Sequence, residues 1–135
     1  ENVELPLIYR GVSRSVRQEL SREALKKVGL EHRMDHKPSE MSGGQQQRVA
    51  IARAIAQAPP VILADEPTGN LDSNSTKEIM DILKGLHNEG RTVILITHDN
   101  DIAAQAKRVI KIKDGKVESD SGQIVPVEEL QTAGA

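Results

Sequence analysis

Two short apolar runs constrain the fold most. They are separated by a segment whose apolar residues have helical periodicity. Residues 61–64 and 92–97 are rich in Val, Ile and Leu and are too short to be helices. The segment between them carries apolar side chains at helical spacing, namely Ile79, Ile82, Leu83 and Leu86. Strand, helix and strand in alternation predict a parallel sheet with right-handed crossovers. Since such uninterrupted apolar strands are typical of a sheet covered on both faces, we expect an α/β fold.

Two further helices are predicted before the first strand. The first has one apolar face at four-residue spacing, formed by Val16, Leu20, Ala24 and Val28. Ser13 suits its N-cap, and Gly29 suits the left-handed position that ends it. The second helix runs from about residue 43 to residue 57, because Pro59 and Pro60 stop it.

These patterns divide the chain into three predicted parts. Residues 1–57 form an α-helical subdomain, residues 58–120 hold the parallel sheet, and residues 121–135 are a tail or linker. Near the end of the second part, Asp114-Gly115 stands between two apolar stretches, which predicts a two-residue β-hairpin turn.

Composition excludes several classes of function. The 135 residues carry a net charge of −2, so overall charge gives no ground for a nucleic-acid partner. There is no cysteine, which excludes disulfides and thiolate metal sites. No apolar run approaches the roughly 20 residues of a membrane-spanning helix.

The pair Asp65-Glu66 is the first candidate site. It follows a buried strand, and the carboxyl edge of a parallel sheet is where open α/β folds bind ligands. Because neighbouring strand residues point to opposite sides, one carboxylate could address a metal and the other a nearby atom. The alternative is a strand that leaves the sheet through two solvated acids.

Ser42-Gly43-Gly44-Gln45 is the second candidate site, at the start of the predicted second helix. A helix N-terminus has unpaired N–H groups and partial positive charge, and glycines let an anion approach the backbone. The alternative is an ordinary helix cap. His98 follows the second strand at the same sheet edge and could stabilise a phosphate, or could simply be solvated.

Taken together, the order and spacing of these residues resemble the ATPases of the ATP-binding-cassette (ABC) family. The matching motifs are the signature at 41–45, Walker B at 61–66, the D-loop at 69–72 and the switch histidine His98. Residues 64–72, Ala-Asp-Glu-Pro-Thr-Gly-Asn-Leu-Asp, are most similar to the lipoprotein-releasing and macrolide-export group. The resemblance implies that residues 58–120 are the C-terminal part of a RecA-like, P-loop NTPase core.

The resemblance also implies a role for each site residue, with ATP and Mg²⁺ as cofactors. Asp65 would help to hold Mg²⁺, Glu66 would be the catalytic base, and His98 would contact the γ-phosphate. The N-terminus of the second helix would bind that phosphate across a dimer interface, through Ser42, Gly43, Gly44 and Gln45. Asp72 would couple the two sites. The implied partners are a second ATPase domain and a transmembrane permease, on the cytoplasmic face of the membrane.

One expected motif is missing. A P-loop has the pattern Gly-x-x-x-x-Gly-Lys-Ser/Thr. The chain has a single Gly-Lys pair, Gly115-Lys116. The next residue is Val117 instead of Ser or Thr, and the position of the first glycine is occupied by Ile110. The P-loop strand is therefore predicted to be absent. We expect the C-terminal portion of an ATPase domain that is inactive in isolation. A non-transport ABC ATPase and a noncatalytic dimerising fragment are the alternatives.

Overall fold

The computed structural model describes residues 1–30 and 42–122 of the chain. Packing divides it into two compact units, Glu1–Ile96 and Thr97–Ala135. The predicted boundary between residues 57 and 58, which separates the α-helical subdomain from the part that holds the sheet, stays a prediction. Met41 of the predicted signature and most of the predicted tail lie outside the described residues.

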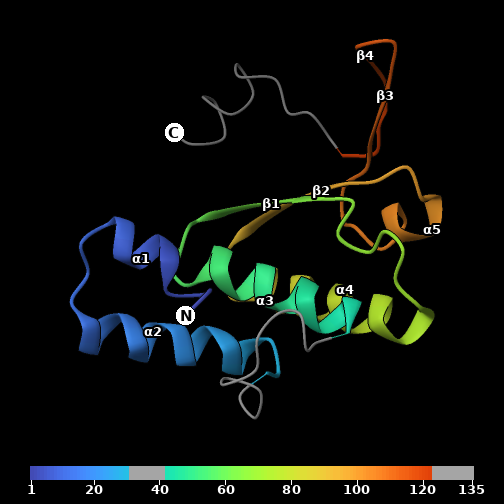
Figure 1. Cartoon of the computed structure of the whole chain (residues 1–135). Helices are drawn as coiled ribbons and strands as arrows, with labels where there is room; N and C mark the ends of the chain where they lie inside the picture. The colour runs from blue at the N-terminus through green and yellow to red at the C-terminus, as the bar shows by residue number, and fades with distance from the viewer. Residues whose placement is uncertain (31–41, 123–135) are drawn as a thin grey trace, which may run out of the picture. The chain divides into compact units, whose positions relative to one another are not determined.

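Three helices open the first unit (Figure 1): α1 (Leu5–Tyr9), α2 (Arg14–Lys27) and α3 (Gly43–Ile55). Helix α2 is the helix predicted after Ser13, and Gly29 behind it has the expected positive φ of 76°. Helix α1 was not predicted; it is a single turn with a proline in its first positions. Its Leu7 is almost completely buried, which anchors this turn in the core.

The sheet of the first unit consists of β1 (Val61–Asp65) and β2 (Thr92–Ile96), joined through α4 (Ser73–Asn88). The strands pair in parallel, with Ile62 opposite Val93 and Asp65 opposite Ile96, so the parallel α/β prediction is confirmed. Helices α3 and α4 lie on the same side of these strands (Figure 1). Helix α4 buries its predicted apolar stripe there, with Ile79 and Leu83 almost fully covered.

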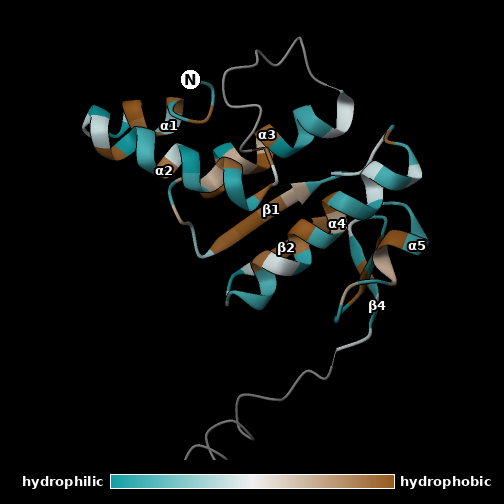
Figure 2. Cartoon of the chain, turned by 90° about the horizontal axis from the view of Figure 1, so that it is seen from below, coloured by the Kyte–Doolittle hydropathy of each residue, from teal (hydrophilic) through white to brown (hydrophobic). Residues whose placement is uncertain are grey.

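The prediction that both sheet faces are covered is wrong for the residues that the structure describes. Ile62 is 5% exposed, whereas its neighbour Leu63 is 70% exposed. The physical reason is that, within the first unit, α3 and α4 lie on one face of the strands only (Figure 1). Strand β1 is nevertheless brown, and so apolar, along most of its length (Figure 2).

The second unit contains the short helix α5 (Asn100–Ala103) and a hairpin of β3 (Ile110–Lys113) and β4 (Lys116–Asp120). The strands are antiparallel, and both turn residues have positive φ, 52° at Asp114 and 73° at Gly115. Such angles at both central positions are those of a type I′ turn, so the predicted hairpin is confirmed. Within the described ranges, no helix is long and apolar enough to cross a bilayer.

Candidate functional site

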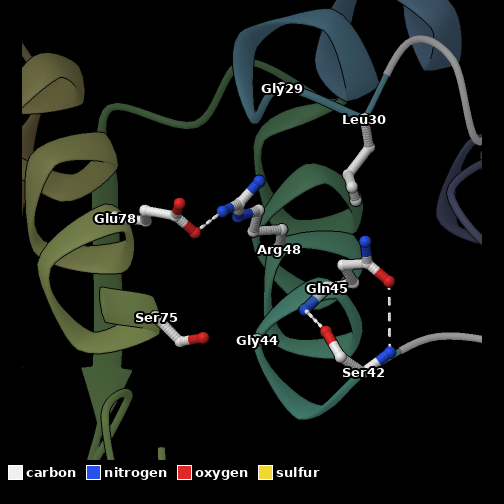
Figure 3. A pocket seen from close by; sticks show the side chains of 8 residues that line it. All are labelled: Gly29, Leu30, Ser42, Gly44, Gln45, Arg48, Ser75 and Glu78. Atoms are coloured by element: carbon white, nitrogen blue, oxygen red, sulfur yellow. Dashed lines mark hydrogen bonds and ion pairs between the residues drawn. The ribbon is translucent and has the colours of Figure 1, made fainter. Parts of the chain in front are cut away.

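The N-terminus of α3 is held by a reciprocal cap between Ser42 and Gln45. The Gln45 backbone N–H donates to Ser42 Oγ at 3.2 Å, and the Ser42 backbone N–H donates to Gln45 Oε1 at 3.1 Å. This capping box satisfies two donors that a helix end otherwise leaves unpaired (Figure 3). Both side chains therefore have a structural role in shaping the helix start.

The two glycines behind this cap differ in their surroundings. Gly44 is buried, and a Cβ placed there would lie 2.7 Å from Ser75 Oγ and 2.9 Å from Ser75 Cβ. At exposed Gly43 the nearest atom would be Leu71 Cδ2 at 3.5 Å, an ordinary contact. Gly44 is therefore needed for close approach of α3 to α4, whereas Gly43 leaves the backbone open to solvent.

Asp72 is the N-cap residue of α4 and is exposed. Hydrogen bonding with Ser75 lowers the pKa of Asp72 and so favours the ionised form of this carboxylate. Since Ser75 also touches Gly44, the N-termini of α3 and α4 lie next to each other. The structure thus brings Asp72 into one group with the predicted signature residues Ser42, Gly43, Gly44 and Gln45.

Asp65 and Glu66 form a second group, at the carboxyl end of β1. Asp65 is the last residue of the strand, and the Glu66 N–H still donates to Ile96 O at 2.8 Å. Glu66 then has a φ of 46°, and its carbonyl accepts from Gly69 N at 3.1 Å to close a turn. Simple strand alternation therefore does not set the direction of the Glu66 side chain, contrary to the reasoning from sequence.

An exposed carboxylate such as Asp65 suits Mg²⁺, which prefers oxygen ligands and usually keeps several waters. Within the described residues, no three or more acidic or histidine side chains gather as a metal site. His98 lies in the second unit, two residues after β2 ends, and is exposed. The next residue, Asp99, turns the chain by donating its N–H to Thr97 Oγ1 at 3.0 Å.

A pocket of about 270 Å³ opens beside the start of α3. Its walls come from the end of α2, from α3 and from α4: Gly29, Leu30, Ser42, Gly44, Gln45, Arg48, Ser75 and Glu78. Across it, the guanidinium of Arg48 pairs with the carboxylate of Glu78 (Figure 3). No role was predicted for Arg48, Ser75 or Glu78. Helical spacing places Arg48 on the same face of α3 as Gly44, and Glu78 on the same face of α4 as Ser75, but it does not show that the two helices pack together.

Comparison with known proteins identifies the family. The family model described as "ABC transporter" matches residues 3–69. The macrolide export ATP-binding/permease protein MacB of Hyphomonas neptunium is 57% identical over 122 residues, which are 90% of this chain and 19% of that protein. MacB of Chlorobium luteolum is 58% identical over 120 residues, 89% of this chain and 18% of that protein. The chain thus spans about a fifth of these relatives.

Solved structures agree with the sequence relatives. The dimeric bacterial ABC transporter cassette MJ0796 has a TM-score of 0.75 at 50% identity and covers 90% of this chain, which spans 54% of it. The cbiO1 protein of Clostridium perfringens, part of the ABC transporter complex cbiONQ, has a TM-score of 0.79 at 33% identity, over 87% of this chain and 48% of that one. The chain therefore belongs to the ABC transporter family and has the fold of part of an ATP-binding cassette.

Proposed function

We propose that this chain is part of the ATP-hydrolysing subunit of an ABC transporter of the macrolide-export or lipoprotein-release type. The observation that carries the proposal is the exposed, capped N-terminus of α3 beside that of α4. It is supported by the similarity to macrolide export ATP-binding/permease proteins of other bacteria.

The start of α3 is proposed to bind the terminal phosphate of ATP. Free N–H groups and the helix dipole favour an anion there, and exposed Gly43 puts no side chain in its way. The capping box orients Ser42 and Gln45 before any ligand arrives, so little reorganisation is needed on binding. Asp72, ionised and next to this helix start, is proposed to link the two ATP sites of a dimer.

The carboxyl end of β1 is proposed to supply the hydrolytic groups. Asp65 would hold Mg²⁺, largely through water, and the metal would neutralise charge on the phosphates. Glu66 would orient and deprotonate the attacking water, and His98 would stabilise charge that develops on the γ-phosphate. Most of the rate enhancement in such a reaction comes from positioning and charge stabilisation.

Two partners belong to the proposal. Two such domains would hold two ATP molecules, each between the P-loop of one domain and Ser42-Gly43-Gly44 of the other, in keeping with the dimeric solved cassette. A transmembrane permease domain or subunit would bind the α-helical part on the cytoplasmic face of the membrane. We propose that this chain alone does not hydrolyse ATP, because no P-loop pattern is present in its sequence.

The substitution Glu66→Gln in the full-length protein tests the assignment of the base. It keeps the size and hydrogen-bonding shape of the side chain but removes the basic oxygen, so hydrolysis should fall by about 100-fold or more. ATP binding, measured by calorimetry, should be retained. Asp81→Asn, the same chemical change at an exposed site on α4, should leave both unchanged. Undiminished hydrolysis in the Glu66→Gln protein would refute the assignment.

A further inference from the structure

Helices α3 and α4 contact each other at two successive points along their lengths. At the first turn, Gly44 approaches Ser75 so closely that no Cβ would fit. One turn further on, Arg48 pairs with Glu78. Because both contacts advance in the same direction, the N-termini of the two helices lie at the same end of the pair.

This arrangement places two positive helix ends side by side. Helix α3 has no acidic residue in its first turn, whereas the ionised N-cap Asp72 offsets part of the positive charge at the start of α4. Two contacts join the helices near these starts, and they act in different ways. The Gly44–Ser75 contact is steric and resists only closer approach. The Arg48–Glu78 pair is attractive and resists separation.

The two side chains of the pair differ in exposure. The Arg48 side chain is 17% exposed, but that of Glu78 is 54% exposed. Water and salt screen the Glu78 side of the pair, whereas the Arg48 guanidinium is largely covered and its Nε has no hydrogen-bond partner among the described residues. Loss of the pair would free α3 to move relative to α4, and with it the phosphate-binding start of α3 relative to Asp72.

We propose that Arg48 is a positioning residue, which through Glu78 holds the phosphate-binding start of α3 in register with the start of α4. This inference rests on the proposed function. Arg48 does not touch the nucleotide; it acts through the helix that carries Ser42 and Gly43. Its effect therefore belongs to the assembled, reacting state of the dimer rather than to the initial binding of ATP.

The kinetic test uses three variants of the full-length transporter. Two are the single substitutions Glu78→Gln and Arg48→Glu, and the third is the charge exchange Arg48→Glu with Glu78→Arg. Each single variant should lower kcat about tenfold and leave KM for ATP within about twofold, whereas the exchange restores kcat. The matched control is Glu89→Gln, which removes the exposed Lys27–Glu89 pair at the other end of α4 and should change neither constant. Unfolding temperatures of Glu78→Gln and Glu89→Gln should be equal.

A distance measurement separates positioning from a merely structural role. Residues 1–135 contain no cysteine, so within this part of the transporter spin labels would attach only at Ala50→Cys on α3 and Lys77→Cys on α4, both exposed. The distance distribution should broaden in Glu78→Gln and not in Glu89→Gln.

Three results would overturn the inference: unchanged kcat in the single variants, failure of the charge exchange to restore it, or a loss of kcat that follows a loss of thermal stability. The Glu66→Gln protein is measured alongside. If it hydrolyses ATP normally, the proposed function fails. If it is inactive while Glu78→Gln keeps its kcat, only the positioning role fails.

Discussion

At the scale of single residues, Gly44 is the position where the smallest change should have a large effect. Replacing glycine by alanine inside a helix normally stabilises it, by roughly 0.5–1 kcal/mol. At Gly44, however, the new Cβ would lie 2.9 Å from Ser75 Cβ, which rotation of the Ser75 side chain cannot relieve. We expect Gly44→Ala to destabilise the full-length cassette by about 1–3 kcal/mol, as overpacking does, measured by urea denaturation.

The chain contains its own control for this prediction. Gly85 lies in α4, and a Cβ added there would meet nothing within 4 Å. Gly85→Ala should therefore stabilise the protein. Adding Ser75→Gly to Gly44→Ala removes the opposing Cβ and should recover most of the lost stability. If Gly44→Ala proves as favourable as Gly85→Ala, the close approach of α3 and α4 does not exist in solution.

The residues of the candidate site were predictable to different degrees. The spacing of Ser42 and Gln45 is that of a capping box, so both their helix start and their proximity follow from local sequence. The positive φ of Glu66 could not be predicted, because Glu has no preference for that conformation and the turn to Gly69 imposes it. The Arg48–Glu78 pair depends on tertiary packing of α3 on α4, which spacing alone does not specify.

At the scale of elements, the β3–β4 hairpin is closed by an ion pair with a measurable pH dependence. Arg108 donates to both carboxylate oxygens of Asp120, at 3.0 and 2.6 Å. These hydrogen bonds, with a further one from the Gly122 N–H, lower the pKa of Asp120 from 3.8 to about 2. A carboxyl group with a lower pKa in the folded state stabilises that state above the unfolded pKa. The stabilisation is therefore lost as pH falls from about 4 to about 2.

Carboxyl-carbon NMR of Asp120 checks this directly. The titration midpoint should lie near 2, and in Arg108→Gln it should return toward 3.8. Lys111→Gln removes a positive charge from the same hairpin without touching the pair and should leave the midpoint low. A wild-type midpoint near 4 would mean that Arg108 and Asp120 are not paired in solution.

Most elements of the fold follow from local sequence signals. Asp114-Gly115 predicts the β3–β4 turn, and Gly29 predicts the end of α2. Each of these positions needs a positive φ, which these residues tolerate. The single-turn helix α1 lacks such a signal: too short for periodicity, it is held by burial of Leu7. Local sequence also could not predict whether one or both faces of the sheet are covered, because an apolar strand does not specify which element packs against it.

At the scale of the whole molecule, the apolar strands β1 and β2 have one covered and one exposed face. The exposed face is aliphatic, with exposed fractions of 48% for Val61, 70% for Leu63, 46% for Ile94 and 53% for Ile96. Leu63 and Ile94 are direct partners in the parallel register, so their side chains lie at the centre of this face. A contiguous apolar surface of this kind drives association in water.

We therefore predict that residues 1–135, expressed alone, self-associate through this sheet face. Sedimentation velocity should show species larger than a monomer of 14.7 kDa. The double substitution Leu63→Thr with Ile94→Thr puts a β-branched side chain, which suits a strand, at both positions while removing apolar surface, so it should shift the population toward monomer. Val16→Thr, at a 48% exposed position on α2, alters a single apolar side chain elsewhere and should not. Equal dissociation by both variants would locate the association outside the sheet, whereas a monomeric parent chain would show that the exposed face alone is insufficient to drive it.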